Sequence, residues 1–94
     1  MLLVEIAARF GKNLSRCRKR AGLSQEEVGI RASLHRTEIG LLERGERLPR
    51  IDTVIKLAGA VSVHPSELIE GIEWAPGSSS RGSFSVAAPE SQPS

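Results

Sequence analysis

The most constraining feature of this chain is a pair of very short helices with an unusually clear start signal. Ser24 and Glu27 have the S-x-x-E spacing of a capping box, in which each side chain satisfies a backbone N–H at the start of a helix. The spacing of the apolar residues then predicts a helix over 25–32 and another over 36–44. Two helices this short, joined by so brief a turn, must cross steeply.

The inner angle between these helices must be closed by apolar side chains and must be free of bulk where the helices approach most closely. Gly29, the fifth residue of the first of them, avoids such bulk. Five apolar residues are spaced to close the angle: Val28, Ala32, Leu34, Ile39 and Leu42. The turn residue is Ser33, and a non-glycine residue in left-handed φ costs roughly 1 to 2 kcal/mol. Either the turn differs from the usual one, therefore, or some stability is lost.

Helical spacing extends over the rest of residues 1–71. A first helix is predicted to end at Gly22, with one stripe made of Ile6, Phe10, Leu14, Cys17 and Ala21. After Pro49, a fourth helix is predicted to carry on one face Ile51, Val54, Leu57, Ala58 and Val61. Pro65 opens a short fifth helix. The predicted fold is all-α, a compact bundle of five helices.

The composition changes near residue 73, where Ser, Pro, Gly and Ala become dominant. Residues 74–94 contain too little apolar surface to offset the entropy of ordering, so a mostly disordered C-terminal tail is predicted after a domain over 1–73. One alternative stays open for residues 82–86. Phe84 and Val86 alternate there, which also suits a short strand or a segment that docks on a partner.

Cysteine and histidine usage excludes several classes of function. The single cysteine, Cys17, cannot form an internal disulfide, and its spacing from His35 and His64 does not resemble a metal site. No nucleophile, base and orienting acid can be assembled from these residues, so no enzyme, metal or cofactor is expected. The apolar start of the chain is interrupted by Glu5 and Arg9, which makes it too short for a signal peptide or a membrane span. A cytoplasmic protein without membrane association is expected.

The charge of the chain indicates little by itself. The net charge of +2 is too small to identify a partner, although six basic residues lie within residues 9–20. Taken alone, this run fits a solvated helix face or an anionic partner.

Three stretches together resemble a known family. "LSQEE" at 23–27, "LLERG" at 41–45 and "LAGAVSVHPSEL" at 57–68 are similar to the Cro/C1-type (XRE-like) helix-turn-helix domain of bacterial and phage transcription regulators. The resemblance covers residues 23–71 directly, with the helix-turn-helix motif at about 25–44. It implies the five-helix, lambda-repressor-like DNA-binding fold, in which the third helix enters the major groove and the second helix abuts the phosphate backbone.

The resemblance also implies roles for individual residues. The residues that face DNA bases are Arg36, Thr37 and Leu41, which suit guanine, thymine and a thymine methyl group respectively. The implied phosphate contacts are Gln25, Arg44, Arg47 and Arg50. A structural ion pair between the first and third helices is implied for Arg18 and Glu43. Glu38 departs from the family pattern, and either forms a surface ion pair or accepts a hydrogen bond from cytosine N4.

The implied function is a sequence-specific regulator of transcription that binds double-stranded DNA. A repressor is expected, acting as a homodimer on a palindromic operator with half-sites about 34 Å apart. The candidates for the dimer interface are Ile55, Ile69, Ile72 and Trp74. The alternative is an antitoxin-type protein that binds a toxin partner through its C-terminal tail and regulates its own operon. A bacterial or phage-encoded protein is expected in either case.

Overall fold

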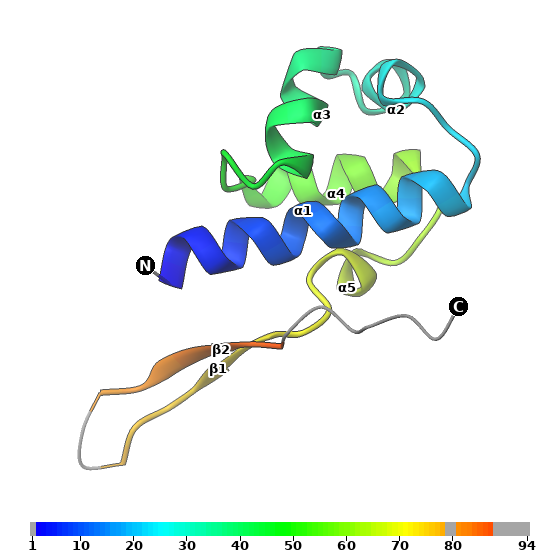
Figure 1. The fold of residues 1–94 in the computed structure, drawn as a ribbon. Coiled ribbons are helices and arrows are strands. Elements are labelled where there is room, and N and C mark those ends of the chain that lie inside the picture. Colours follow the sequence, from blue (N-terminus) through cyan, green and yellow to red (C-terminus); the bar gives the residue numbers. More distant parts are fainter. Residues whose placement is uncertain (1, 79–80, 88–94) are drawn as a thin grey trace, which may run out of the picture.

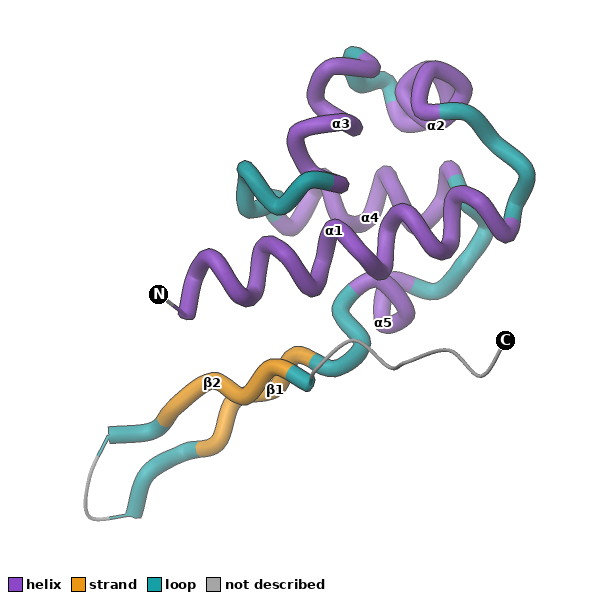
Figure 2. The backbone as a smooth tube through the Cα atoms, in the orientation of Figure 1, coloured by secondary structure: helices purple, strands orange, loops and turns teal. Residues whose placement is uncertain are grey.

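The computed structural model describes residues 2–78 and 81–87, which form five helices followed by a two-stranded hairpin (Figure 1). The elements are α1 (Leu2–Arg20), α2 (Gln25–Ala32), α3 (Arg36–Glu43), α4 (Ile51–Ala60), α5 (Pro65–Leu68), β1 (Ile72–Ala75) and β2 (Ser83–Val86). The helices pack into one body, and the hairpin projects from the side away from α2 and α3 (Figure 2).

The predicted capping box begins α2. The Ser24 hydroxyl accepts a hydrogen bond from the Glu27 N–H at 3.0 Å, and the Glu27 carboxylate accepts one from the Ser24 N–H at 2.8 Å. The backbone N–H of Ser24, followed by its hydroxyl, lowers the pKa of Glu27. This carboxylate therefore stays ionised at the helix start, where the helix dipole favours negative charge.

The turn between α2 and α3 is the tight one that the short spacing predicts. Ser33 adopts left-handed backbone angles, φ 59° and ψ 43°. The turn therefore keeps its usual form, and the protein loses the stability that a non-glycine residue costs in this conformation. Gly29 has no room for a side chain, because a Cβ there would lie 2.6 Å from the carbonyl oxygen of Leu34. Close backbone contact at Gly29 thus sets the angle between the two helices.

The core lies between α1, α3, α4 and α5, with the apolar sides of α2 closing it. Its largest fully buried apolar side chains are Phe10, Leu14, Cys17, Val28, Ile39, Leu42, Leu57 and Leu68. The prediction of burial is wrong for two residues. Ala21 is exposed because α1 ends at Arg20, and Ile51 is exposed because it is the first residue of α4. Side chains on a helix point toward its N-terminus, so that of Ile51 extends past the packed body.

Two polar or small residues of α1, which sequence reasoning did not single out, fix neighbouring elements. The buried Asn13 amide donates at 2.9 Å to the carbonyl oxygens of Leu68, the last residue of α5, and of Glu70, two residues further on. A Cβ at Gly11 would overlap the carbonyl oxygens of Leu42 and Glu43 at the end of α3. The absence of a side chain there lets α1 and α3 touch through their backbones.

The prediction of a compact bundle of five helices is confirmed, but the prediction of an all-α fold is wrong, because residues 72–75 and 83–86 form two strands. β1 and β2 pair antiparallel in the register Ile72–Val86, Glu73–Ser85, Trp74–Phe84 and Ala75–Ser83. β1 runs through the expected domain boundary at residue 73, and the alternative of a short strand within 82–86 is confirmed. Residues 79–80 and 88–94 of the expected tail lie outside the described residues.

The hairpin forms because two kinds of contact offset its small size. The rings of Trp74 and Phe84 meet edge to face, with centroids 5.0 Å apart, an arrangement that stabilises beyond its buried area. At its base, Arg9 of α1 donates to the carbonyl oxygens of Glu70 at 3.0 Å and Ala87 at 3.4 Å. These contacts join residues far apart in the sequence, which composition does not reveal.

Candidate nucleic-acid interface

The face of α3 that points away from the core carries two free polar side chains. Ile39 and Leu42 are completely buried and hold the helix against the body. Arg36 and Thr37 are exposed at its start, and neither side chain makes a hydrogen bond or ion pair within the described chain. Leu41, one turn further on, is half-buried. The three residues expected to face DNA bases therefore lie on the outer side of α3.

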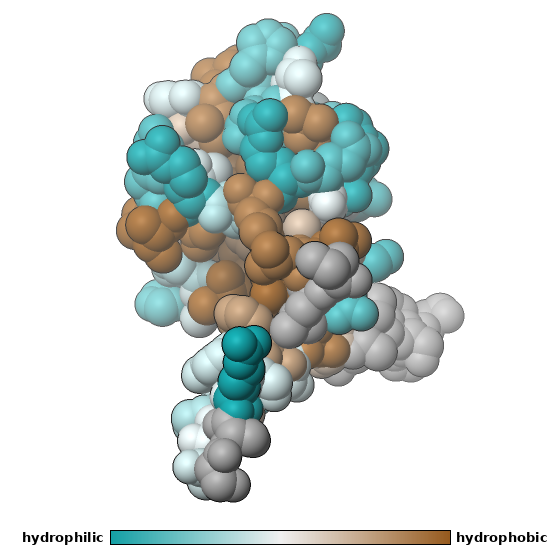
Figure 3. Space-filling model, turned by 90° about the vertical axis from the view of Figure 1, so that its left-hand side faces the viewer, coloured by the Kyte–Doolittle hydropathy of each residue, from teal (hydrophilic) through white to brown (hydrophobic). Residues whose placement is uncertain are grey.

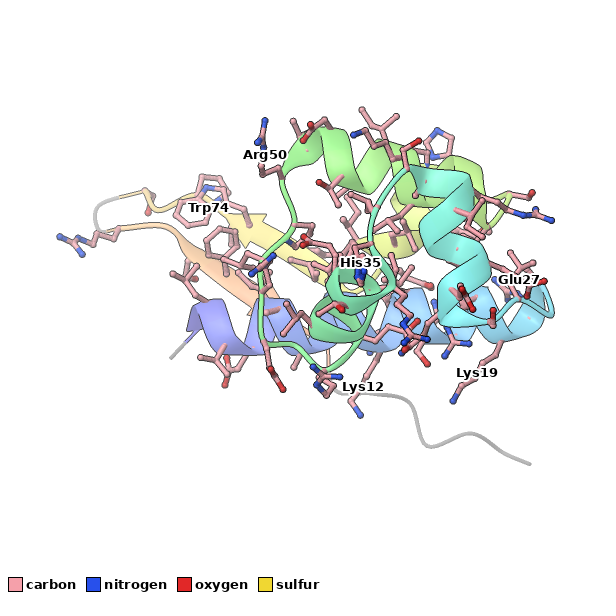
Figure 4. All side chains as sticks on the ribbon, turned by 90° about the horizontal axis from the view of Figure 1, so that it is seen from above. Lys12, Lys19, Glu27, His35, Arg50 and Trp74 are labelled. Carbon is pink, nitrogen blue, oxygen red and sulfur yellow. The ribbon has the colours of Figure 1, made fainter. Side chains whose placement is uncertain are left out.

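His35 caps α3, a role that sequence reasoning missed. Its Nδ1 accepts a hydrogen bond from the Thr37 N–H at 3.0 Å, and His64 caps α5 in the same way through the Ser66 N–H at 3.1 Å. In Figure 4, which looks down onto α2 and α3, His35 lies at the turn between these helices. Histidine is not among the preferred capping residues, so its position gave no signal.

Replacing this cap has a measurable effect. His35→Ala is expected to lower the free energy of unfolding by about 1 kcal/mol, because the N-terminus of α3 loses an acceptor. His35→Asn, which supplies another acceptor at the same place, is expected to retain most of the stability. Urea unfolding followed by circular dichroism measures both. Equal losses in the two variants would contradict the capping role.

One buried carboxylate links the three helices nearest the candidate interface. Arg18 of α1 donates to Glu43 of α3 through Nε at 2.6 Å and Nη2 at 3.0 Å, and its Nη1 donates to the Leu23 carbonyl at 2.9 Å. Only 13% of the Arg18 side chain and 8% of that of Glu43 are exposed. The hydrogen bonds to Glu43 raise the pKa of Arg18, against the opposing effect of burial. The ion pair implied by the sequence is therefore present and largely shielded from water.

The same carboxylate holds Gln25 at the start of α2. The Gln25 amide donates to Oε1 of Glu43 at 3.0 Å, a contact that the sequence analysis did not anticipate. An amide nitrogen has two N–H groups, so one remains available to a phosphate. Arg18, Glu43 and Gln25 thus form a chain of hydrogen bonds that aligns the second helix with the third.

The three arginines after α3 are each paired with a nearby carboxylate at the surface. Arg44 pairs with Glu46 at 2.9 Å, Arg47 with Glu38 at 2.5 Å and Arg50 with Asp52 at 3.4 Å. Of the two interpretations of Glu38, the structure shows the surface ion pair. Exposed pairs of this kind contribute about 0 to 1 kcal/mol. A phosphate can therefore replace the carboxylate at a small cost in free energy. Figure 4 shows that Arg50 extends from the edge of the helical body.

Two kinds of feature, a membrane-crossing helix and a cluster of metal ligands, are missing from the described residues. None of their helices combines the length and apolar character that a membrane crossing requires. Within the same residues, no three side chains of His, Cys, Asp or Glu gather into a possible metal site.

Residues 9–70 match the family described as a helix-turn-helix domain, which covers well over half of the chain. The chain belongs to this family. The match, together with the relatives below, confirms the resemblance to DNA-binding transcription regulators of the Cro/C1 (XRE) type. The hairpin lies beyond the matched residues.

Two relatives and one solved structure illustrate the similarity. An uncharacterized HTH-type transcriptional regulator, y4dJ of Sinorhizobium fredii, is 38% identical over 66 residues, which is 70% of this chain and 86% of the relative. Control protein C.BamHI of Bacillus amyloliquefaciens is 34% identical, over 65% of this chain and 76% of its own. The crystal structure of the restriction-modification controller protein C.AhdI from Aeromonas hydrophila has a TM-score of 0.64 and 37% identity, covering 66% of this chain and 94% of that one.

Proposed function

We propose that the chain is a transcriptional repressor that binds a specific double-stranded DNA sequence as a homodimer, with α3 in the major groove. The observation that carries this proposal is the pair Arg36 and Thr37, exposed and without partners in the described chain at the start of a firmly anchored helix. This is the part of a recognition helix that contacts base edges. Relatives named as a transcriptional regulator and as control proteins support a regulatory role.

Each outward residue of α3 matches a chemical group in the major groove. The Arg36 guanidinium can donate two hydrogen bonds to O6 and N7 of guanine, while Thr37 can contact thymine through its hydroxyl or methyl group. Leu41 has no polar atoms in its side chain, so it suits only a thymine methyl group. Specificity would therefore depend mainly on Arg36.

Gln25, Arg44, Arg47 and Arg50 would hold the DNA backbone on both sides of α3. The N-terminus of α2 favours an anion through its dipole and through the N–H groups that the capping box leaves free, and Gln25 adds a side-chain donor there. The three arginines would exchange their carboxylate partners for phosphates.

Removing one phosphate contact changes the salt dependence of binding. Arg47→Ala is expected to weaken binding to all sequences alike and to reduce the slope of log affinity against log salt by about 0.9, because one phosphate is no longer neutralised. The matched control is Arg20→Ala, since Arg20 is also exposed and paired, to Glu67 at 2.9 Å, but lies on α1. Fluorescence anisotropy at several salt concentrations measures both slopes. Equal slopes for Arg47→Ala and the unaltered chain would remove Arg47 from the interface.

The experiment that tests the proposal as a whole is selection of bound sequences from random double-stranded DNA. A motif with two-fold symmetry and half-sites about 34 Å apart is expected. Failure to enrich any motif would overturn sequence-specific binding, and a single unrepeated half-site would overturn the homodimer. The antitoxin alternative is less favoured, because the relatives described above are named as a regulator and control proteins.

A further inference from the structure

The hairpin is amphipathic, and its apolar face extends beyond the helical body. Side chains alternate across a strand, so the register places on one face Ile72, Trp74, Phe84 and Val86. The other face carries Glu73, Ala75, Ser83 and Ser85. At the base of the hairpin Ile72 and Val86 are half-buried, whereas Trp74 and Phe84 are 56% and 40% exposed. The aromatic pair is therefore partly exposed to solvent, whereas the opposite face of the hairpin carries only polar or small side chains.

This face adjoins further apolar surface on the body. Figure 3 shows hydrophobic side chains gathered at the end of the molecule from which the hairpin projects. The N-terminal end of α1 lies at this end (Figure 1), where Leu3 is 53% exposed. We call the apolar face of the hairpin, which consists of Ile72, Trp74, Phe84 and Val86, the hairpin patch. It exposes on the order of 300 Å², at the lower end of the range of patches that are often functional on a monomer.

We propose that the hairpin patch is an interface with the same patch of a second copy of this chain. The proposal rests on the homodimer of the proposed function and names the surface that forms it. In a two-fold contact, each side chain near the axis faces itself or a close neighbour, so a charge there would meet a like charge. The hairpin patch consists only of apolar side chains and avoids that repulsion.

The area of the patch also fits a second copy. A stable interface of standard size buries about 800 Å² per partner, of which somewhat more than half is apolar. The hairpin patch supplies roughly half of that apolar share, and Arg81, in the loop that connects the two strands, can form part of the rim.

Two observations favour a second copy of the chain as the partner of the hairpin patch. The first concerns residues 88–94, and the second concerns access of DNA to α3. Residues 88–94 contain no aromatic and no branched aliphatic side chain, so they are poorly suited to cover Trp74. The hairpin projects away from α2 and α3 in Figure 1, so pairing through it leaves Arg36 and Thr37 accessible. Dimer formation and groove recognition would then use different sides of the molecule.

Trp74 is the only tryptophan in the chain, so its fluorescence reports directly on this surface. Dilution of the unaltered protein is expected to shift its emission to longer wavelength, with the same midpoint as dissociation of the dimer in sedimentation velocity. A protein that remains monomeric across the concentration range, with constant emission, overturns the proposal and would leave the patch to a different protein partner.

Phe84→Glu is expected to weaken the dimer at least tenfold, because it places two carboxylates near each other across the interface. The matched control is Ile30→Glu, since Ile30 is 73% exposed but lies on α2. Phe84→Lys is also expected to be monomeric, and a mixture of the Glu and Lys variants is expected to recover association. Recovery on mixing shows that both variants keep a competent hairpin. A Phe84→Glu dimer as tight as the unaltered one, or no recovery on mixing, overturns the proposal.

Binding of the same samples to a selected half-site separates this inference from the proposed function. Phe84→Glu is expected to keep its affinity for an isolated half-site and to lose cooperative binding to the full operator. If Phe84→Glu binds the full operator as well as the unaltered chain does, only the hairpin interface fails. If the unaltered chain selects no DNA sequence, the proposed function fails whatever the hairpin does.

Discussion

Arg18→Ala is expected to lower the free energy of unfolding by about 3 to 5 kcal/mol, because it leaves a buried carboxylate without its charge partner. Glu43 would retain only the Gln25 amide as a hydrogen-bond donor, and the Leu23 carbonyl would lose its contact with Nη1. Chemical unfolding followed by circular dichroism at α-helical wavelengths measures the loss. The effect is large because only 8% of the Glu43 side chain is exposed, so this carboxylate is poorly solvated without the guanidinium.

Two further variants isolate the cause of that loss. Arg20→Ala breaks a pair whose side chains are 60% and 46% exposed, and is expected to cost at most about 1 kcal/mol. Adding Glu43→Gln to Arg18→Ala removes the unpaired charge and is expected to recover part of the stability. A loss below about 1 kcal/mol for Arg18→Ala would mean that the buried pair contributes no more than a surface pair.

The second large effect concerns DNA recognition. Arg36→Ala is expected to weaken operator binding by about 1 to 3 kcal/mol and to relax the preference at one base pair, because two hydrogen bonds to guanine are lost. Its stability should be unchanged, since the Arg36 side chain is exposed and contacts no hydrogen-bond partner in the described residues. Binding-site selection and anisotropy titration measure the two effects on binding.

Arg36→Lys distinguishes base readout from charge. Lysine keeps the positive charge but cannot present the planar pair of donors, so it is expected to retain part of the affinity while losing most of the guanine preference. If Arg36→Ala selects the same motif as the unaltered chain, α3 does not read DNA through this residue.

The parts of the fold that could be predicted are those encoded by neighbouring residues. The capping box, the apolar spacing along α2 and α3 and the brief turn at Ser33 are all local, and the structure confirms them. The pairing of Arg18 with Glu43 was available only through resemblance to a family, because the two residues are 25 positions apart. The contact of Gln25 with the same carboxylate has no local signal, and no pattern predicted it.

The hairpin could be predicted only in part, because the alternation of Phe84 and Val86 indicates a short strand, whereas its pairing with β1 and its attachment to α1 leave no local pattern. Trp74 meets Phe84, and Arg9 reaches the carbonyl oxygen of Ala87, 78 positions away. The ion pairs of the arginines after α3 could not be predicted from the sequence either. The family resemblance implies phosphate contacts for those arginines, but only the folded loop shows that each has a carboxylate within reach. These pairs would make phosphate binding an exchange of partners.

The backbone contact at Gly11 bears on how such a protein can acquire a new target sequence. Because α1 lies directly against the carbonyl oxygens that end α3, there is no room for α3 to tilt or slide. In the proposed complex, the angle at which α3 enters the groove would therefore be fixed by the whole helical body. A change of target sequence would then come from substituting the outward residues 36, 37 and 41 while the helical body stays the same. An engineer could therefore vary these three positions to change the DNA sequence that is bound.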